Sequence, residues 1–143
     1  EHTGYGVDTR LERLGRTVGE EMLEPTRIYV KTVLPLLDSF RIKGFAHITG
    51  GGLTENIPRI LPEGMGIRIR TGTWPVLPVF DLIRELGDVS ETEMRRTFNM
   101  GIGMCLVVAK EDADRAAAAL AASGQPARVI GEIAEGEKEV ELC

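Results

Sequence analysis

Apolar residues in the first part of the chain recur at a helical spacing. Over residues 8–23 the repeat falls at Leu11, Leu14, Val18 and Leu23. This spacing predicts a helix. A second helix is predicted from Pro25 onward, because the fixed φ of proline suits a first helical turn. Pro35 lies within this second run and lacks a backbone donor, so we expect a kink there or two shorter helices.

The middle of the chain predicts two strands with a glycine turn and a short helix between them. Residues 43–49 form a short, largely apolar segment that leads into three consecutive glycines at 50–52, which is typical of a buried strand ending in a tight turn. Residues 53–61 predict a short helix after this turn. In residues 64–70 apolar side chains alternate with glycine and arginine, and this alternation predicts a half-exposed strand. We expect His47, on the first strand, to be a hydrogen-bonded core residue.

The second half of the chain alternates helices and strands. Residues 75–87 predict an amphipathic helix that ends at Gly87. The next helix is expected to begin at Ser90, because Ser90 and Glu93 have the spacing of a capping box. The remaining predicted elements are a strand at 101–109, a helix at 111–124 and two strands at 127–134 and 138–142.

This order of elements indicates the fold class. Strands and helices alternate, which predicts an α/β (α+β) fold with a single mixed β-sheet covered by helices. The length of 143 residues favours one domain, because domains of about 100–200 residues are the most common. The sequence contains neither a low-complexity linker nor an internal repeat that would divide it.

The composition excludes several classes of partner. Seventeen Lys and Arg against 22 Asp and Glu give a net charge of −5, and only 5% of the residues are aromatic. Polynucleotides are bound by clustered basic residues and by stacking aromatic rings, so we expect no nucleic-acid partner. The longest uncharged run, residues 97–109, is shorter than the ~20 residues that span a bilayer, so we expect no membrane partner. A single phosphate group could still be held by backbone N–H groups.

The two cysteines give no sign of a metal site or a disulfide framework. Cys105 lies in an apolar run, Cys143 is the last residue, and no Cys-x-x-Cys spacing occurs. We therefore expect one buried and one exposed thiol, no metal ligands, and a reducing, cytoplasmic location.

Two segments could carry chemistry, and the first is the glycine run at 50–52. Glycines let a backbone approach a ligand closely, and a helix that begins after them directs its free N–H groups toward that ligand. This arrangement suits a phosphate group. The alternative is a tight connection between a strand and a helix, without a ligand. The run matches neither a P-loop nor a dinucleotide-binding glycine motif.

The second segment is residues 96–104. Gly101 and Gly103 interrupt an apolar strand, which indicates a bulge or the close approach of another group. Asn99 stands at the start of that strand and offers two donors and an acceptor. The alternative is a glycine-containing bend in a packed strand.

Four phrases of the sequence carry a family resemblance. They are EPTRIYVKTVLPLL at 24–37, GFAHITGGGLTENIPRILPEG at 44–64, TWPVLPVFDLI at 73–83 and EMRRTFNMGIGMCLVV at 93–108. In this order and spacing, from about Leu23 to Ile133, they resemble the carboxy-terminal domain of the aminoimidazole ribonucleotide synthetases, also called phosphoribosylformylglycinamidine cyclo-ligases.

The resemblance implies an ATP-dependent, ring-closing ligase of purine biosynthesis. Its substrate would be formylglycinamidine ribonucleotide and its product aminoimidazole ribonucleotide, with ATP and Mg²⁺ as cofactors. A separate amino-terminal domain would supply most of the ATP and Mg²⁺ site and the main contacts of a homodimer. Residues 1–22 would be a linker or helical lead-in from that domain, and residues 23–143 the carboxy-terminal, substrate-side domain. This chain alone is therefore expected to be inactive.

The resemblance also implies roles for residues in the two glycine segments. The residues expected to hold the ribose phosphate are Thr49, Gly50, Gly51 and Gly52. Those expected to line or brace this site are Asn56 and Arg59. Those expected to form the floor of the substrate cleft are Thr97, Asn99 and Gly101. No catalytic residue is assigned, although His47 is a candidate general base.

Other functions stay open on the sequence. One alternative is a related two-domain, ATP-using enzyme of the selenophosphate synthetase or thiamine phosphate kinase type. Another is a phosphate-ligand binding module without chemistry, and a third is an interaction domain whose glycines only turn the chain. The combination of HITGGGLTENIPR and FNMGIGM favours the cyclo-ligase.

Overall fold

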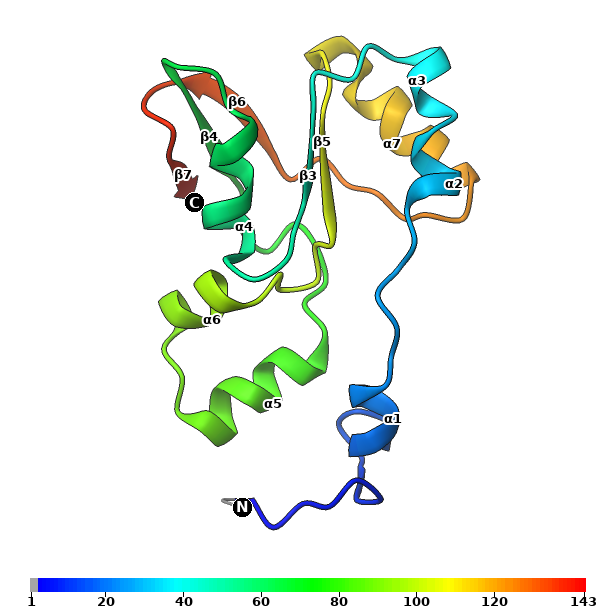
Figure 1. The fold of residues 1–143 in the computed structure, drawn as a ribbon, viewed down its shortest axis with the longest axis vertical. Coiled ribbons are helices and arrows are strands. Elements are labelled where there is room, and N and C mark those ends of the chain that lie inside the picture. The colour runs from blue at the N-terminus through cyan, green and yellow to red at the C-terminus, as the bar shows by residue number, and fades with distance from the viewer. Residues whose placement is uncertain (1–2) are drawn as a thin grey trace.

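The computed structural model describes residues 3–143, which form a folded body and an N-terminal arm (Figure 1). The arm, residues 3–29, holds a small antiparallel hairpin of β1 (Arg10–Leu11) and β2 (Arg16–Thr17), followed by α1 (Val18–Met22). Two arginines of the arm contact the body: the Arg13 guanidinium donates to the carboxylate of Glu85 over 2.8 Å, and that of Arg27 donates to Gln125 Oε1 over 3.1 Å. Tyr29, at the end of the arm, also packs against the body.

The helix predicted over residues 8–23 is therefore wrong for all but its last turn. Gly15 has a φ of 70°, which turns the chain between β1 and β2. Thr17 then starts α1 with a capping box, in which its side chain accepts from the Glu20 N–H and the Glu20 carboxylate accepts from the Thr17 N–H. These local hydrogen bonds override the apolar spacing.

Proline has different effects at its two positions in the next segment. No helix begins at Pro25, since residues 24–29 have no regular secondary structure and α2 (Val30–Val33) starts five residues later. Pro35 separates α2 from α3 (Leu36–Ser39), so the prediction of two shorter helices is confirmed.

The central strands form two separate sheets. In one, β3 (Gly44–His47) pairs antiparallel with β5 (Met104–Val107). In the other, β4 (Met65–Ile69) lies between β6 (Gly131–Glu135), which is antiparallel to it, and β7 (Val140–Leu142), which is parallel.

The α/β class is confirmed, but the expected single sheet is divided. Both edges of β4 are occupied, one by β6 and the other by β7. No edge of β4 is therefore free to pair with β3 or β5, and these two strands pair with each other.

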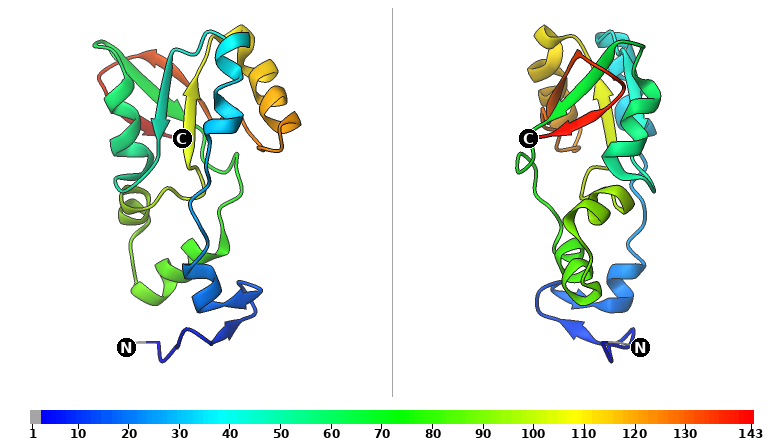
Figure 2. Two further views of the ribbon diagram at one scale, coloured as in Figure 1. Left: turned by 45° about the vertical axis from the view of Figure 1, so that its right-hand side comes forward. Right: turned by 90° about the vertical axis from the view of Figure 1, so that its left-hand side faces the viewer.

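Helices lie on both sides of the β3–β5 pair, whereas the outer side of the three-stranded sheet has no helix of the described chain in front of it (Figures 1 and 2). The helices after α3 are α4 (Gly52–Asn56), the 3-10 helix η1 (Ile57–Ile60), α5 (Pro78–Gly87), α6 (Glu91–Thr97), the 3-10 helix η2 (Lys110–Asp112) and α7 (Ala113–Ala122). The helices α2, α3 and α7 lie on one side of the β3–β5 pair, and α4 with the three-stranded sheet lies on the other. None of the helices in residues 3–143 combines the length and the apolar character needed to cross a membrane.

The main core lies between α4, η1 and the strands β3 and β4. Its buried members are Ala46, Ile48, Leu53, Ile57, Leu61, Ile67, Ile69 and Trp74. Because Leu53 and Ile57 follow the glycine run directly, this core fixes the position of the turn between β3 and α4.

Cys105 packs against this core, and its burial raises the pKa of the thiol to about 12, whereas Cys143 is exposed. In the unfolded chain the thiol ionises near its ordinary pKa of 9.0. The thiol's contribution to stability is therefore fully present below pH 9 and is lost as the pH rises from 9.0 toward about 12.

We expect urea unfolding to show a steeper loss of stability between pH 8 and pH 10.5 for the natural chain than for Cys105→Val. Parallel losses for the two proteins would contradict the raised pKa of the Cys105 thiol.

Candidate functional site

The glycine turn predicted from the sequence is a tight loop between β3 and α4. We call residues 49–52 the glycine loop. The Gly52 N–H donates to the Thr49 carbonyl over 3.0 Å, and the Glu55 N–H donates to the Gly51 carbonyl over 3.0 Å. Gly51 and Gly52 have φ values of 98° and 57°, and α4 begins at Gly52 itself. The loop therefore turns the chain sharply into the first turn of the helix.

The fold constrains the three glycines of the loop to different degrees. A Cβ on Gly52 would overlap the carbonyl oxygen of Arg95 and lie 2.7 Å from that of Phe98. A Cβ on Gly51 would lie 2.8 Å from the Cβ of Glu55. By contrast, a Cβ on Gly50 would have no heavy atom of the described chain within 4 Å, and its φ lies outside the left-handed region. The fold thus requires Gly51 and Gly52 but gives no reason for Gly50.

Asn56 fastens the glycine loop from the protein side. Its side chain is buried, and its Nδ2 donates to the carbonyls of Gly52 (2.8 Å), Gly50 (3.2 Å) and Thr49 (3.4 Å). Asn56 therefore braces the loop and does not face solvent. Arg59, on the next helical turn, is exposed.

The structure brings the second predicted segment against the first. Gly52 packs against the carbonyls of Arg95 and Phe98 at the end of α6, immediately before residues 99–101. Because only a hydrogen occupies the side-chain position of Gly52, the two glycine segments touch through their backbones. The two segments that the sequence singled out are therefore in contact.

The segment after α6 is a strained turn. Met100 and Gly101 both have positive φ, 50° and 95°, and the Gly101 N–H donates to the Asn99 Oδ1 over 2.9 Å. The indole N–H of Trp74 donates to the Met100 carbonyl over 2.9 Å in a buried hydrogen bond. Asn99 therefore uses one side-chain oxygen to hold this turn. The Thr97 hydroxyl donates to Glu93 Oε1 over 3.1 Å, back along α6.

The close approach predicted at Gly103 is confirmed, and the approaching group is Tyr29. A Cβ on Gly103 would overlap the Tyr29 hydroxyl oxygen. The Tyr29 ring also meets the His47 ring edge to face, with centroids 6.1 Å apart. The prediction of a core position for His47 is wrong, because on β3 Phe45 and His47 lie on the exposed face while Ala46 lies on the buried one.

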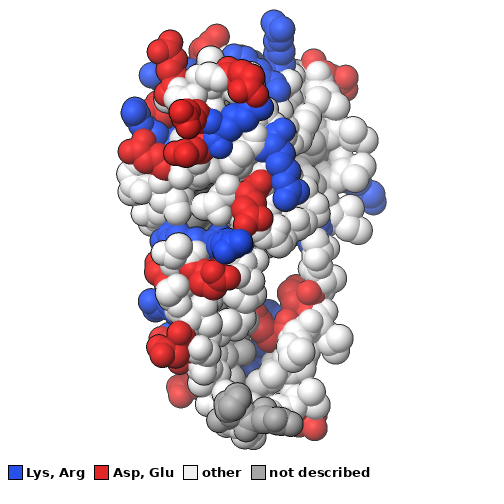
Figure 3. All heavy atoms as spheres, turned by 60° about the vertical axis from the view of Figure 1, so that its left-hand side comes forward, with Lys and Arg blue, Asp and Glu red and all other residues white. Residues whose placement is uncertain are grey.

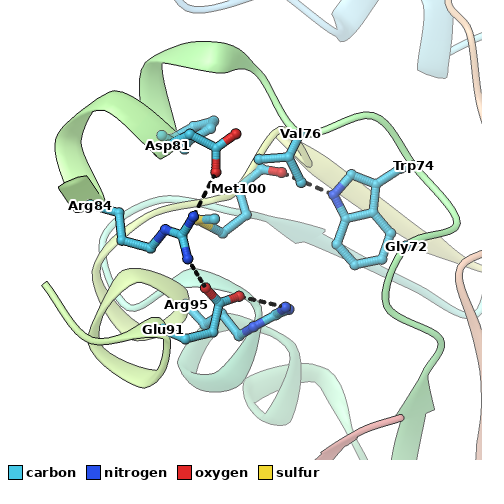
Figure 4. Close-up of a pocket in the computed structure, with 9 residues that line it drawn as sticks. Gly72, Trp74, Val76, Asp81, Arg84, Glu91, Arg95 and Met100 are labelled. Atoms are coloured by element: carbon cyan, nitrogen blue, oxygen red, sulfur yellow. Dashed lines mark hydrogen bonds and ion pairs between the residues drawn. The ribbon is translucent and has the colours of Figure 1, made fainter.

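A cleft that the sequence analysis missed lies behind the 99–101 turn (Figure 4). This Trp74 cleft has a volume of about 270 Å³ and is lined by Gly72, Trp74, Val76, Phe80, Asp81, Arg84, Glu91, Arg95 and Met100. Its charged side chains form one series of ion pairs, Asp81–Arg84 (3.4 Å), Arg84–Glu91 (3.8 Å) and Glu91–Arg95 (2.7 Å). The first and third of these pairs have the helical i,i+3 and i,i+4 spacings, but the pair between the two helices, Arg84–Glu91, has no sequence signal.

Charges of both signs are interspersed over the face that carries α4 and α6 (Figure 3). Within residues 3–143, no three or more His, Cys, Asp or Glu side chains gather in a way that could hold a metal ion.

Comparison with known proteins assigns the family. A family model described as "AIR synthase related protein, C-terminal domain" matches residues 3–143. This chain belongs to that family. The resemblance drawn from the four sequence phrases is thus confirmed, and it extends over nearly the whole chain.

Three similar proteins share the name phosphoribosylformylglycinamidine cyclo-ligase. That of Acetivibrio thermocellus is 49% identical over 99% of this chain, that of Desulfitobacterium hafniense 57% over 88%, and that of Brevibacillus brevis 52% over 96%. These matches cover 42%, 37% and 40% of the respective relatives. The chain thus spans about 40% of the length of the relatives that it matches, as the carboxy-terminal family domain.

Proposed function

We propose that this family member is the substrate-side part of an ATP-dependent cyclo-ligase. The whole enzyme would convert formylglycinamidine ribonucleotide to aminoimidazole ribonucleotide in purine biosynthesis. The proposal is supported by the shared name of relatives that are about half identical to this chain. In this reaction ATP would phosphorylate the formyl oxygen and be released as ADP. An amidine nitrogen would then attack the same carbon, and the activated oxygen would leave as phosphate as the ring closes.

The observation that carries the site assignment is Gly50. Its missing side chain is explained neither by its φ nor by a neighbour in the described chain, so close approach of a ligand is a direct reason for it. Within residues 3–143 the N–H groups of Gly50 and Gly51 have no backbone acceptor, and N–H groups of this kind bind phosphate. We infer that the glycine loop, held rigid by Asn56, binds the ribose 5-phosphate of the substrate.

The remaining predicted residues have subordinate roles in this proposal. The exposed Thr49 side chain would offer a hydroxyl beside the phosphate. The exposed Arg59, one helical turn after Asn56, would offer a positive charge. The 97–101 segment, with Thr97, Asn99 and Gly101, would form the floor under the reacting formyl and amidine groups. We assign no general base.

We propose that ATP and Mg²⁺ are bound mainly by an amino-terminal domain of the whole enzyme. Mg²⁺ prefers carboxylate and other oxygen ligands, and residues 3–143 contain no suitable cluster of acids. The relatives are more than twice as long as their matched portions, which leaves room for such a domain. A homodimer of the whole enzyme and a cytoplasmic location belong to the same proposal.

Gly50→Val is the substitution that tests this function. Since the added atoms would meet no described neighbour, we expect the free energy of unfolding, measured in urea, to change by no more than about 0.5 kcal/mol. The affinity of the chain for formylglycinamidine ribonucleotide, measured by calorimetry, should fall by at least about tenfold, because the side chain fills the position of the phosphate. Unchanged affinity in a folded variant would remove the assignment of the loop.

A further inference from the structure

An ion pair beside the glycine loop joins α4 to α6. The Arg96 Nε donates to Glu55 Oε1 over 3.1 Å. The other carboxylate oxygen, Oε2, lies close to Gly51, because a Cβ on that glycine would be 2.8 Å from it. The Glu55 carboxylate therefore lies close to the glycine loop and holds the Arg96 guanidinium near that loop.

Most of the hydrogen-bonding capacity of Arg96 is unused. A guanidinium has five N–H donors, and the hydrogen bond to Glu55 takes the one on Nε. The terminal Nη1 and Nη2 groups form no side-chain hydrogen bond within residues 3–143, and the side chain is 66% exposed. A planar pair of N–H donors of this kind matches two oxygens of a phosphate.

Stabilisation of the fold is a weak explanation for this pair. Exposed ion pairs contribute little to stability. The two helices are already joined by the backbone contact of Gly52 with the carbonyls of Arg95 and Phe98. The pair also places the Glu55 carboxylate where it would repel a phosphate bound at the loop. A contact that only stabilised the fold would not require a negative charge at this position.

We propose that Arg96 is a specificity-determining residue that binds the phosphate monoester at the glycine loop, and that Glu55 holds it in place until the ligand arrives. This inference rests on the proposed function of the loop. The dianionic phosphate competes with the Glu55 carboxylate for the guanidinium, so Arg96 moves from one anion to the other. The ligand class is a pentose 5-phosphate, and the uncharged sugar gains nothing from the exchange.

The chain contains a matched control for this pair. Arg68 Nε donates to Glu141 Oε2 over 2.8 Å across the three-stranded sheet. The exposed fractions are similar in the two pairs, 57% and 64% for Arg68 and Glu141 against 66% and 48% for Arg96 and Glu55. Arg68→Gln therefore removes an equivalent ion pair away from the glycine loop.

The test titrates ribose 5-phosphate and ribose into the natural chain and into Arg96→Gln, Glu55→Gln and Arg68→Gln, with amide NMR shifts as the readout. We expect Arg96→Gln to weaken ribose 5-phosphate binding by at least about tenfold, because a charge-assisted bidentate contact is lost. Glu55→Gln should strengthen it by about two- to fivefold, because a competing anion is removed. Arg68→Gln should leave it unchanged.

The opposite signs of the two substitutions separate binding from a structural contact. If Arg96→Gln and Glu55→Gln weaken binding equally, or if Arg96→Gln has no effect, the inference is overturned. If Arg96→Gln has no effect while Gly50→Val still abolishes binding, the proposed function of the loop survives without it. If the natural chain binds ribose as well as ribose 5-phosphate, or neither compound, both proposals fail.

Discussion

Gly52→Ala is expected to lower the free energy of unfolding by about 2–5 kcal/mol. The left-handed φ of 57° costs a residue with a Cβ about 1–2 kcal/mol. The new Cβ would also overlap the Arg95 carbonyl and crowd the Phe98 carbonyl, and forced overpacking costs about 1–3 kcal/mol more. Both carbonyls belong to backbone at the end of α6, so neither can move away as a flexible side chain would.

Gly50→Ala is the matched control for this prediction. It places the same methyl group two residues earlier, where no described atom lies within 4 Å. Urea unfolding of both variants and of the natural chain measures the difference. Equal stabilities of Gly50→Ala and Gly52→Ala would show that α6 does not pack against the loop through Gly52.

Asn56→Ala should cost about 2–3 kcal/mol of stability, the second-largest effect that we expect. The substitution removes a buried donor shared by three loop carbonyls, and leaving buried polar groups unpaired costs about 1–3 kcal/mol. The loop should also loosen, with faster hydrogen exchange at Gly52, whose N–H donates to Thr49.

Asn99→Ala provides the comparison for Asn56→Ala. Asn99 is only half-buried, and its side chain accepts a single hydrogen bond, from the Gly101 N–H. We expect about 1 kcal/mol of destabilisation and unchanged hydrogen exchange at Gly52. If Asn56→Ala were no more destabilising than Asn99→Ala, Asn56 would not be the brace of the loop.

Local sequence signals predicted the elements that depend on local chemistry. Pro35 divides a helix, and the Ser90 hydroxyl accepts from the Glu93 N–H at the start of α6, as their spacing indicated. The same kind of signal failed over residues 8–23, because the turn at Gly15 and the capping box at Thr17 compete with apolar spacing. Periodicity describes which side chains share a face, but it does not reveal where a turn interrupts the helix.

Non-local packing could not be predicted in the same way. The division into two sheets depends on β7 occupying the second edge of β4, and β7 is the last strand of the chain. The Trp74 cleft is lined by residues of both α5 and α6, and a single ion pair, Arg84–Glu91, joins these separate helices. Neither arrangement leaves a mark in a short window of sequence.

At the glycine loop, the sequence predicted the turn but could not give a reason for each glycine. From the sequence, its glycines are equivalent, and either a phosphate cradle or a plain turn explains them. In the structure, Gly52 is explained by α6 and Gly51 by Glu55, and only Gly50 is left without a reason in the fold. This distinction is what turns the run of glycines into a specific, testable site.

The most direct test of the glycine-loop assignment is an amide NMR titration of this chain with formylglycinamidine ribonucleotide, with the dephosphorylated riboside as control. The loop assignment predicts the largest shifts from Gly50 to Asn56 with the phosphorylated compound, and much smaller shifts there with the riboside. Largest shifts at Asp81, Arg84 and Glu91 would place the ligand in the Trp74 cleft instead. That result, or equal shifts with the two compounds, would contradict the assignment of the phosphate to the glycine loop.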